Sequence, residues 1–286
     1  MKAIILNLSA WVMLPIMDGF AKYLSSTLPV LQITWSRYFF TVLITLPIML
    51  IFFRKNLTWT EQPKLQLIRG LLLFCANILF FYSISIISLS KALTLAFIAP
   101  LIVTALSPVL LGEKVGFRRW AAVITGFIGS LIVIRPGFVE LNLASIAALG
   151  TGVLYGFYLI ITRKLHNSDN PLLTLLLTGV VGAILGTMIM PTVWVQPTIS
   201  EWYMMFGIGF FATIGHLFLI LSLKYADVSK LAPFGYFEIV TNIIIGYYFF
   251  NHFPDNWTFF GLFIIISSGF YIFRREIHIK SDYNSK

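Results

Sequence analysis

Long apolar stretches recur along the chain, each close to the length of a membrane-spanning helix. A helix that crosses about 30 Å of hydrocarbon needs about 20 mostly apolar residues. The stretches, separated by short polar segments, are 3–23, 31–53, 66–87, 91–111, 119–135, 142–163, 171–190, 202–223, 229–250 and 257–273. This pattern predicts an all-α membrane protein with ten transmembrane helices. No loop is long enough to form a domain, so function must lie within the bundle or at its mouths.

The composition supports a membrane environment. Of the 286 residues, 58% are hydrophobic and 11% are charged, and the mean hydropathy is +0.89. Soluble domains carry about 25% charged residues, so these values exclude a soluble enzyme, a nucleic-acid-binding domain and a disordered regulator. The single cysteine, Cys75, excludes an intrachain disulfide. The four histidines show no metal-ligand spacing, and we expect neither a metal nor a cofactor.

The positive charges predict the orientation. If the N-terminus is cytoplasmic, most of the 20 Lys and Arg residues fall on the cytoplasmic side, and only Lys22, Lys91 and Arg135 lie outside. Lys and Arg are enriched in cytoplasmic loops, which explains the net charge of +9 and places both termini inside. Asp18 and Lys22 follow the first apolar stretch, and a signal-peptide cleavage site is not evident, so we interpret this stretch as a retained helix.

The two halves of the chain are related. Without a gap, aligning Gly70 with Gly209 also aligns Ser83 with Ser222 and Arg135 with Arg274. Because each half holds five helices, an odd number, the second half lies upside down in the membrane. An inverted repeat of this kind is typical of transporters with a central site. The expected organisation is a first repeat over 1–137, a second repeat over 138–275 and a cytoplasmic tail over 276–286.

Several motifs resemble a known family. They are Asp18-Gly-Phe-Ala-Lys-Tyr-Leu, Arg37-Tyr-Phe-Phe, the stretch from Ala99-Pro to Gly-Glu113, Ile134-Arg-Pro-Gly137 and Ala232-Pro-Phe-Gly-Tyr-Phe-Glu-Ile-Val240. With these motifs the chain resembles the drug/metabolite transporter superfamily, specifically its ten-helix proteins with two EamA-type repeats. It departs from the family at Asn251-His252, where the second repeat usually has Gly-Glu, which puts in doubt a role for a Glu pair symmetric with Glu113.

The resemblance implies a secondary transporter of a small organic metabolite in the bacterial inner membrane, a monomer or homodimer in contact with membrane lipid. Riboflavin uptake is the first expectation, and the alternatives are S-adenosylmethionine uptake or export of an amino acid or another metabolite. The absence of a Walker A glycine loop argues against ATP drive by this chain. A membrane enzyme would need a clustered His/Asp or Cys/His set, which the sequence does not suggest. A structural or lipid-flipping protein is a further alternative.

Ionisable residues within a span cost about 2.5–3.5 kcal/mol and are candidates for function. Glu238 lies near the middle of the ninth stretch, where it either couples transport to protons or cations or packs against a neighbouring helix. Arg37 either binds an anionic group of the substrate, pairs with Asp18 or extends to the lipid headgroups. Asp18 is spaced to pair with Lys22 one helical turn away, or it contacts substrate.

The remaining candidates are polar or aromatic. His216 falls on the repeat partner of Asn77, so the two side chains suit a site between the repeats, although His216 is equally compatible with a core position. Aromatic side chains deep in the spans can stack on a planar or cationic solute. They are Trp11, Trp35, Tyr82, Tyr155, Tyr158 and Tyr236. Pro100 and Pro108 are expected to interrupt the fourth helix.

Overall fold

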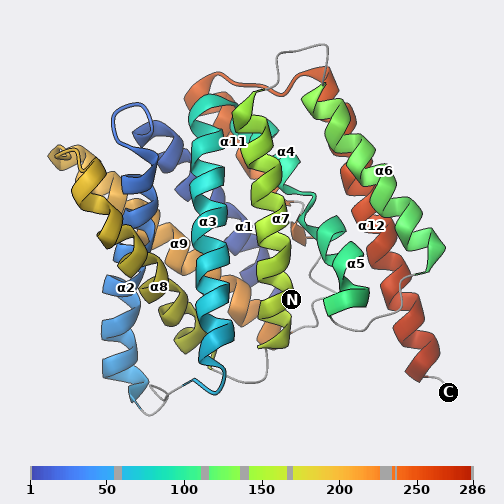
Figure 1. Cartoon of the computed structure of the whole chain (residues 1–286), viewed down its shortest axis with the longest axis horizontal. Coiled ribbons are helices and arrows are strands. Elements are labelled where there is room, and N and C mark those ends of the chain that lie inside the picture. Colours follow the sequence, from blue (N-terminus) through green and yellow to red (C-terminus); the bar gives the residue numbers. More distant parts are fainter. Residues whose placement is uncertain are drawn as a thin grey trace.

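The computed structural model of the chain describes residues 2–54, 60–110, 116–135, 142–165, 170–225, 234–235 and 237–284. Figure 1 shows the helices that these residues form. In chain order, they are α1 (Lys2–Leu24), α2 (Val30–Phe52), α3 (Pro63–Ile86), α4 (Leu89–Ala96), α5 (Ala99–Leu110), α6 (Phe117–Ile134), α7 (Leu143–Lys164), α8 (Pro171–Val193), α9 (Ile199–Tyr225), α11 (Phe237–Phe250) and α12 (Asn256–Asn284).

These helices confirm the ten expected spans. Seven stretches are long and apolar enough to cross a membrane, and one of them, Leu89–Leu106, combines α4 with most of α5. Three shorter apolar helices complete the set: Trp120–Ile134, Phe237–Phe250 and Asn256–Tyr271. Many large apolar side chains are exposed on these helices, as expected of a protein that faces lipid rather than water.

Helices of the first half pack against helices of the second half in a symmetric pattern. The first span, α1, packs along α9, the eighth span, while the sixth span, α7, packs along α3, the third. If the two halves of the chain are interchanged, each of these two contacts is converted into the other. The second span packs on the seventh (α2 on α8), the fourth on the ninth (α4 on α11) and the fifth on the tenth (α6 on α12). The fold is therefore a 5+5 inverted repeat in which the repeats interdigitate.

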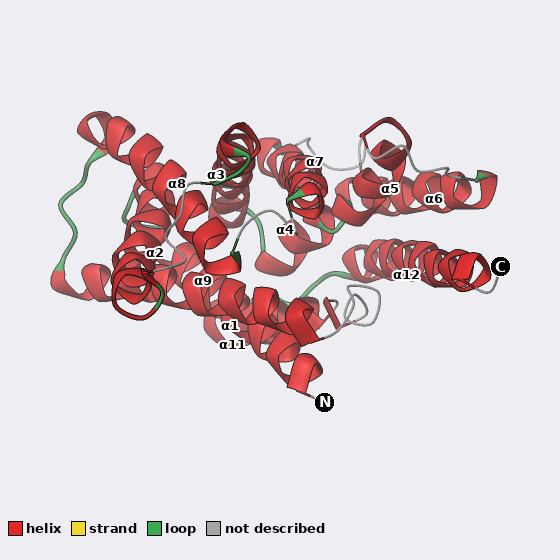
Figure 2. Cartoon of the chain, turned by 90° about the horizontal axis from the view of Figure 1, so that it is seen from below, coloured by secondary structure: helices red, strands yellow, loops and turns green. Residues whose placement is uncertain are grey.

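Figures 1 and 2 place α6 and α12 side by side at one end of the molecule, with α2 and α8 at the other end. Small residues allow α6 and α12 to approach closely: a Cβ at Gly129 would lie 3.0 Å from the carbonyl oxygen of Gly261. Lipid tails are as apolar as leucine, so close packing of this kind is a main source of helix association in membranes.

The fourth span is broken just before Pro100, as expected for one of its two prolines. The helix ends at Ala96 and resumes at Ala99, so that Pro100 lies in the first turn of α5, where its missing N–H costs little. Pro108 lies inside α5 without ending it, which corrects the expectation that both prolines interrupt the helix. The break rests on α7, where a Cβ at Gly152 would lie 2.7 Å from the carbonyl oxygen of Ala96.

Among the described residues, one ion pair joins the two halves, at the end of the bundle that also carries Lys22. Arg135, at the end of α6, pairs with Asp255, which precedes α12. Asp255 also accepts a hydrogen bond of 2.7 Å from the Thr258 backbone N–H. Partial burial raises the pKa of Asp255, but the hydrogen bonds from Thr258 and the nearby Arg135 charge outweigh this effect and hold the pKa below its ordinary value.

Candidate functional site

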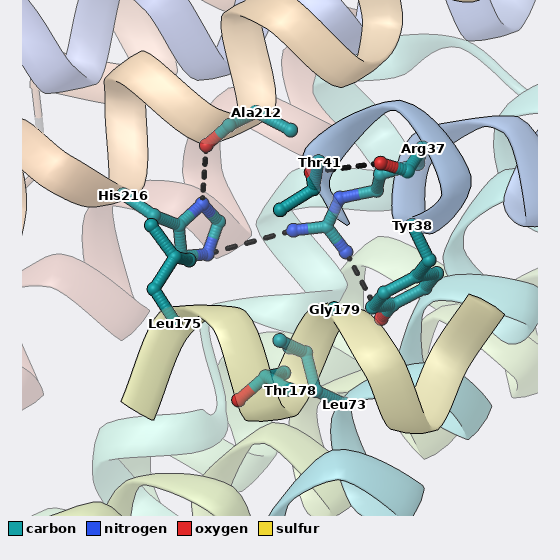
Figure 3. Close-up of a pocket in the computed structure, with 9 residues that line it drawn as sticks. All are labelled: Arg37, Tyr38, Thr41, Leu73, Leu175, Thr178, Gly179, Ala212 and His216. Carbon is teal, nitrogen blue, oxygen red and sulfur yellow. Dashed lines mark hydrogen bonds between the residues drawn. The ribbon is translucent and has the colours of Figure 1, made fainter. Parts of the chain in front are cut away.

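The centre of the candidate site is Arg37, which is 4% exposed on α2. Its Nη1 donates to the Tyr38 hydroxyl at 3.2 Å, and its Nη2 lies 3.5 Å from His216 Nε2 on α9. Figure 3 shows the guanidinium held between these two side chains. Arg37 Nε is buried and has no hydrogen-bond partner among the described residues. Arg37 therefore points into the bundle rather than to the headgroups, which contradicts the alternative that it extends to lipid.

His216 is held as a hydrogen-bond acceptor for Arg37. Its Nδ1 lies 2.9 Å from the carbonyl oxygen of Ala212 (Figure 3). A carbonyl can only accept, so Nδ1 carries the hydrogen, and Nε2 of the neutral ring presents a lone pair. An arginine can only donate, so this tautomer suits the contact between His216 and Arg37.

Tyr38 extends the network from α2 to α3. Asn77 Nδ2 on α3 donates to the Tyr38 hydroxyl at 2.5 Å and to the Leu73 carbonyl oxygen at 2.7 Å. The order of contacts is therefore His216, Arg37, Tyr38, Asn77. The pseudosymmetric pair Asn77 and His216 lies at the two ends of one polar network between the repeats. The sequence singled out these two residues and Arg37, but it did not single out Tyr38, the next residue in the same motif.

Two carboxyl groups lie close to this network. Asp18 on α1 is 3% exposed, and its Oδ1 is buried without a hydrogen bond among the described residues. Asp18 interacts electrostatically with Arg37, and Glu238 interacts electrostatically with Asp18. In the described part of the chain, however, Asp18 forms no ion pair with Arg37. The carboxyl groups and the guanidinium are thus near neighbours without direct contact.

The expected pair between Asp18 and Lys22 does not form. Lys22 Nζ instead donates to the carbonyl oxygens of Ile84 and Ile87 at 2.6 Å and 3.0 Å. These carbonyls end α3, where a cation is stabilised by the unpaired backbone oxygens and by the helix dipole. Lys22 is therefore occupied by α3, and Asp18 is left facing the interior.

Glu238 is the second residue of α11, in the first helical turn. Residues 226–233 and 236, which include the start of the same apolar stretch, lie outside the described part of the chain. The described residues show no hydrogen bond from its side chain to a neighbouring helix, whereas its backbone carbonyl accepts from Asn242. Burial of Glu238 is partial, and its carboxyl also interacts electrostatically with Tyr155 on α7.

A second arginine, Arg69 on α3, is buried in the bundle, although the sequence did not single it out. It was counted among the cytoplasmic charges, but it is 3% exposed and points into the bundle. Its guanidinium donates to Thr162 Oγ1 at 2.8 Å, Thr178 Oγ1 at 2.5 Å and the Tyr158 hydroxyl at 2.7 Å. It also donates to the Thr174 carbonyl at 3.3 Å. The rule that singled out Arg37, an arginine within a span, applies equally to Arg69.

A small cavity lies beside Arg37. Its volume is about 20 Å³, and its lining includes Arg37, Thr41, Thr178 and His216 (Figure 3). A space of this size holds about one water molecule and is too small for an organic solute. A larger recess of about 330 Å³ opens beside Lys22, Tyr23 and Phe250. Ser25, Ser26 and Ser85 also line this recess, which therefore lies at the C-terminal end of α1.

Of the aromatic candidates that the structure describes, Tyr155 and Tyr158 lie beside the charged groups. Their rings stack with centroids 5.3 Å apart, and Arg69 lies 4.6 Å from the centroid of the Tyr158 ring. Trp11 Nε1 instead donates a hydrogen bond to Asn7 at 2.8 Å, and Trp35 Nε1 donates one to Thr187 at 3.0 Å. The indole N–H groups of both residues are therefore paired with other protein side chains.

Of the two remaining aromatic candidates, the structure describes Tyr82 alone. Tyr82 is half-buried on α3. Tyr236 and the Gly-Glu113 stretch lie outside the described residues. No group of three or more potential metal ligands occurs among the residues that the structure describes.

Comparison with known proteins gives a consistent result. Residues 1–135 and 142–274 match a family described as the EamA-like transporter family. An S-adenosylmethionine uptake transporter of Rickettsia bellii is 29% identical over 262 residues, covering 91% of this chain and 89% of that protein. A riboflavin transporter of Vibrio cholerae is 24% identical over 273 residues, covering 94% and 92%. A crystal structure with 17% identity has a TM-score of 0.64 and covers 93% of this chain and 94% of that chain, which supports the fold.

Proposed function

Because this chain belongs to the EamA-like transporter family, we propose that it is a secondary carrier that takes up S-adenosylmethionine across the inner membrane of a bacterium. It is a multi-pass membrane transporter, and its substrate is a small molecule. This proposal reverses the order of the two expected substrates. The relative named for S-adenosylmethionine uptake is more similar to the chain than the relative named for riboflavin, and the family motifs alone do not separate the two.

One observation supports this choice most strongly: the interior holds charged groups that lack close partners of opposite charge among the described residues. Asp18 and Arg37 are both buried, each has an unpaired polar atom, and Glu238 lies near Asp18. S-adenosylmethionine carries a sulfonium, an ammonium and a carboxylate, so it can satisfy groups of both signs. Riboflavin is uncharged at neutral pH and would leave the buried charges unpaired, which is costly in a low-dielectric interior.

The stacked pair Tyr155 and Tyr158 supports the same substrate. Aromatic rings stabilise both planar bases and nearby cations. Tyr155 interacts electrostatically with Glu238 and with Arg37, which places this ring beside the charged groups. An adenine ring or a sulfonium beside Tyr155 would therefore remain within reach of Glu238.

Transport would proceed by alternating access between the two repeats, 1–137 and 138–275. We place both termini and the tail over 276–286 in the cytoplasm, because most Lys and Arg residues lie at that end. The recess beside Lys22 then opens to the outside, and the 20 Å³ cavity at Arg37 marks a closed site that must widen to admit substrate. A single chain holds every group that the mechanism requires, so a monomer or a homodimer would serve.

Uptake by purified protein in proteoliposomes tests the proposal. We expect saturable entry of radiolabelled S-adenosylmethionine that unlabelled S-adenosylmethionine abolishes and that riboflavin at equal concentration leaves unchanged. Asp18→Asn should reduce this uptake strongly, because the buried negative charge is lost. Asp255→Asn is the matched control, since Asp255 lies outside the site, paired with Arg135, and should change uptake little. Entry of riboflavin in place of S-adenosylmethionine, or no entry of either, would contradict the proposal.

A further inference from the structure

Two buried polar atoms of opposite charge lack partners in the same region. Arg37 Nε and Asp18 Oδ1 are both inaccessible to solvent, and neither makes a hydrogen bond within the described structure. The two side chains are near enough to interact electrostatically but too far apart to form an ion pair. Leaving a buried charged group without hydrogen bonds is costly, so these two atoms are suited to bind a ligand that carries both charges.

The free edge of Arg37 has the geometry of a carboxylate site. Nε and Nη2 lie on one edge of a guanidinium, and this edge binds carboxylates through two parallel hydrogen bonds. Among the described residues, the contact on that edge of Arg37 is the 3.5 Å contact from Nη2 to His216, while Nη1 is held by Tyr38 at 3.2 Å. Tyr38 therefore fixes the far corner of the guanidinium and leaves the binding edge open.

Asp18 supplies the complementary half of the site. Lys22, its nearest basic neighbour along the helix, is held by the carbonyls that end α3, so the Asp18 carboxylate remains available to an ammonium. We propose that Arg37 and Asp18 together bind an α-amino-acid head group, with its carboxylate on Arg37 and its ammonium on Asp18. This assignment rests on the proposed function, and it specifies which end of the substrate is recognised. Glu238 then remains free to face the sulfonium.

Competition by fragments of the substrate tests this assignment directly. S-adenosylhomocysteine keeps the amino-acid head group but lacks the sulfonium charge, whereas 5′-methylthioadenosine keeps the nucleoside and lacks the head group. Both are added to proteoliposomes that take up radiolabelled S-adenosylmethionine. We expect S-adenosylhomocysteine to inhibit at a concentration at least about tenfold lower than 5′-methylthioadenosine, because a site built for polar groups discriminates against analogues without them.

Variants sharpen the test. Arg37→Lys retains the charge but not the two-pronged edge, so it should raise the inhibitory concentration of S-adenosylhomocysteine by about tenfold and leave that of 5′-methylthioadenosine unchanged. The unaltered protein alone suffices if this variant fails to fold. Equal inhibition by the two compounds, in protein that still takes up S-adenosylmethionine, would overturn the head-group assignment. It would indicate that only water bridges Arg37 and Asp18. Absence of S-adenosylmethionine uptake would instead refute the proposed function.

Discussion

Substitution of Gly182 on α8 by alanine should weaken substrate binding without touching the binding groups. The Tyr38 ring packs directly on Gly182, and a Cβ at this position would lie 2.8 Å from Tyr38 Cδ2 and nearer still to Cγ and Cδ1. Carbon atoms in favourable contact are about 3.5–4.0 Å apart. The ring must therefore move by about 1 Å or more, because the backbone of a packed helix yields less readily than a side chain.

The expected loss follows from the two hydrogen bonds that this movement breaks. Arg37 Nη1 donates to the Tyr38 hydroxyl at 3.2 Å, so a further 1 Å takes the pair beyond hydrogen-bond range. Asn77 loses the same acceptor. A hydrogen bond to a charged group contributes about 1.5–3 kcal/mol, and a loss of about 2 kcal/mol weakens binding about 30-fold.

Equilibrium binding of radiolabelled S-adenosylmethionine to detergent-purified protein measures this loss. Gly207→Ala on α9 is the control, because its added Cβ would meet only the edge of Phe20, at 3.2 Å, and affinity should stay within about twofold. Tyr38→Phe keeps the ring and lacks only the hydroxyl, so it should reproduce the loss without the steric clash. Binding by Gly182→Ala or Tyr38→Phe within twofold of the unaltered protein would refute the role of Tyr38 in supporting Arg37.

Three further predictions concern orientation, coupling and stability. In a cysteine-free background, an impermeant thiol reagent on intact cells should label Asn256→Cys and spare Gly116→Cys; equal labelling would refute the proposed orientation. Glu238→Gln keeps most hydrogen bonding but cannot titrate, so it should retain substrate exchange between equally loaded sides and lose substrate accumulation driven by a proton gradient. The control Glu61→Gln, at an exposed position, should accumulate substrate normally. Unchanged pH dependence in Glu238→Gln would exclude this carboxyl as the coupling site. Arg69→Leu removes four hydrogen bonds and should lower the thermal unfolding temperature in detergent by several degrees. Arg69→Lys, which lacks the planar guanidinium, should recover only part of this loss. An unchanged unfolding temperature in Arg69→Leu would contradict a stabilising role.

The membrane-spanning architecture could be predicted from the sequence because it depends on one-dimensional patterns. Each span must be apolar over its whole length, so hydropathy alone indicates the ten crossings. The odd number of helices per repeat then requires the second repeat to be inverted. The same alignment paired Asn77 with His216, which the structure places at the two ends of one network.

The partners of the charged side chains could not be predicted in this way. Sequence spacing favoured Lys22 as the partner of Asp18, but the end of α3 offers Lys22 two carbonyl oxygens and leaves Asp18 facing Arg37. Arg69 was assigned to the cytoplasmic charges because it is near the start of its span, yet α7 and α8 surround it with hydroxyl groups. Both outcomes depend on how each helix is rotated about its axis.

That rotation is decided by tertiary packing. In a soluble helix the polar face reveals which side is exposed, but in a membrane the outer and inner faces are both apolar, since lipid tails resemble leucine side chains. The sequence therefore determined where each helix lies along the chain and which residues are costly to bury. The tertiary structure decided which of these residues meet, because close contacts such as Tyr38 on Gly182 fix how the helices pack and thereby bring Arg37, Asp18 and His216 together.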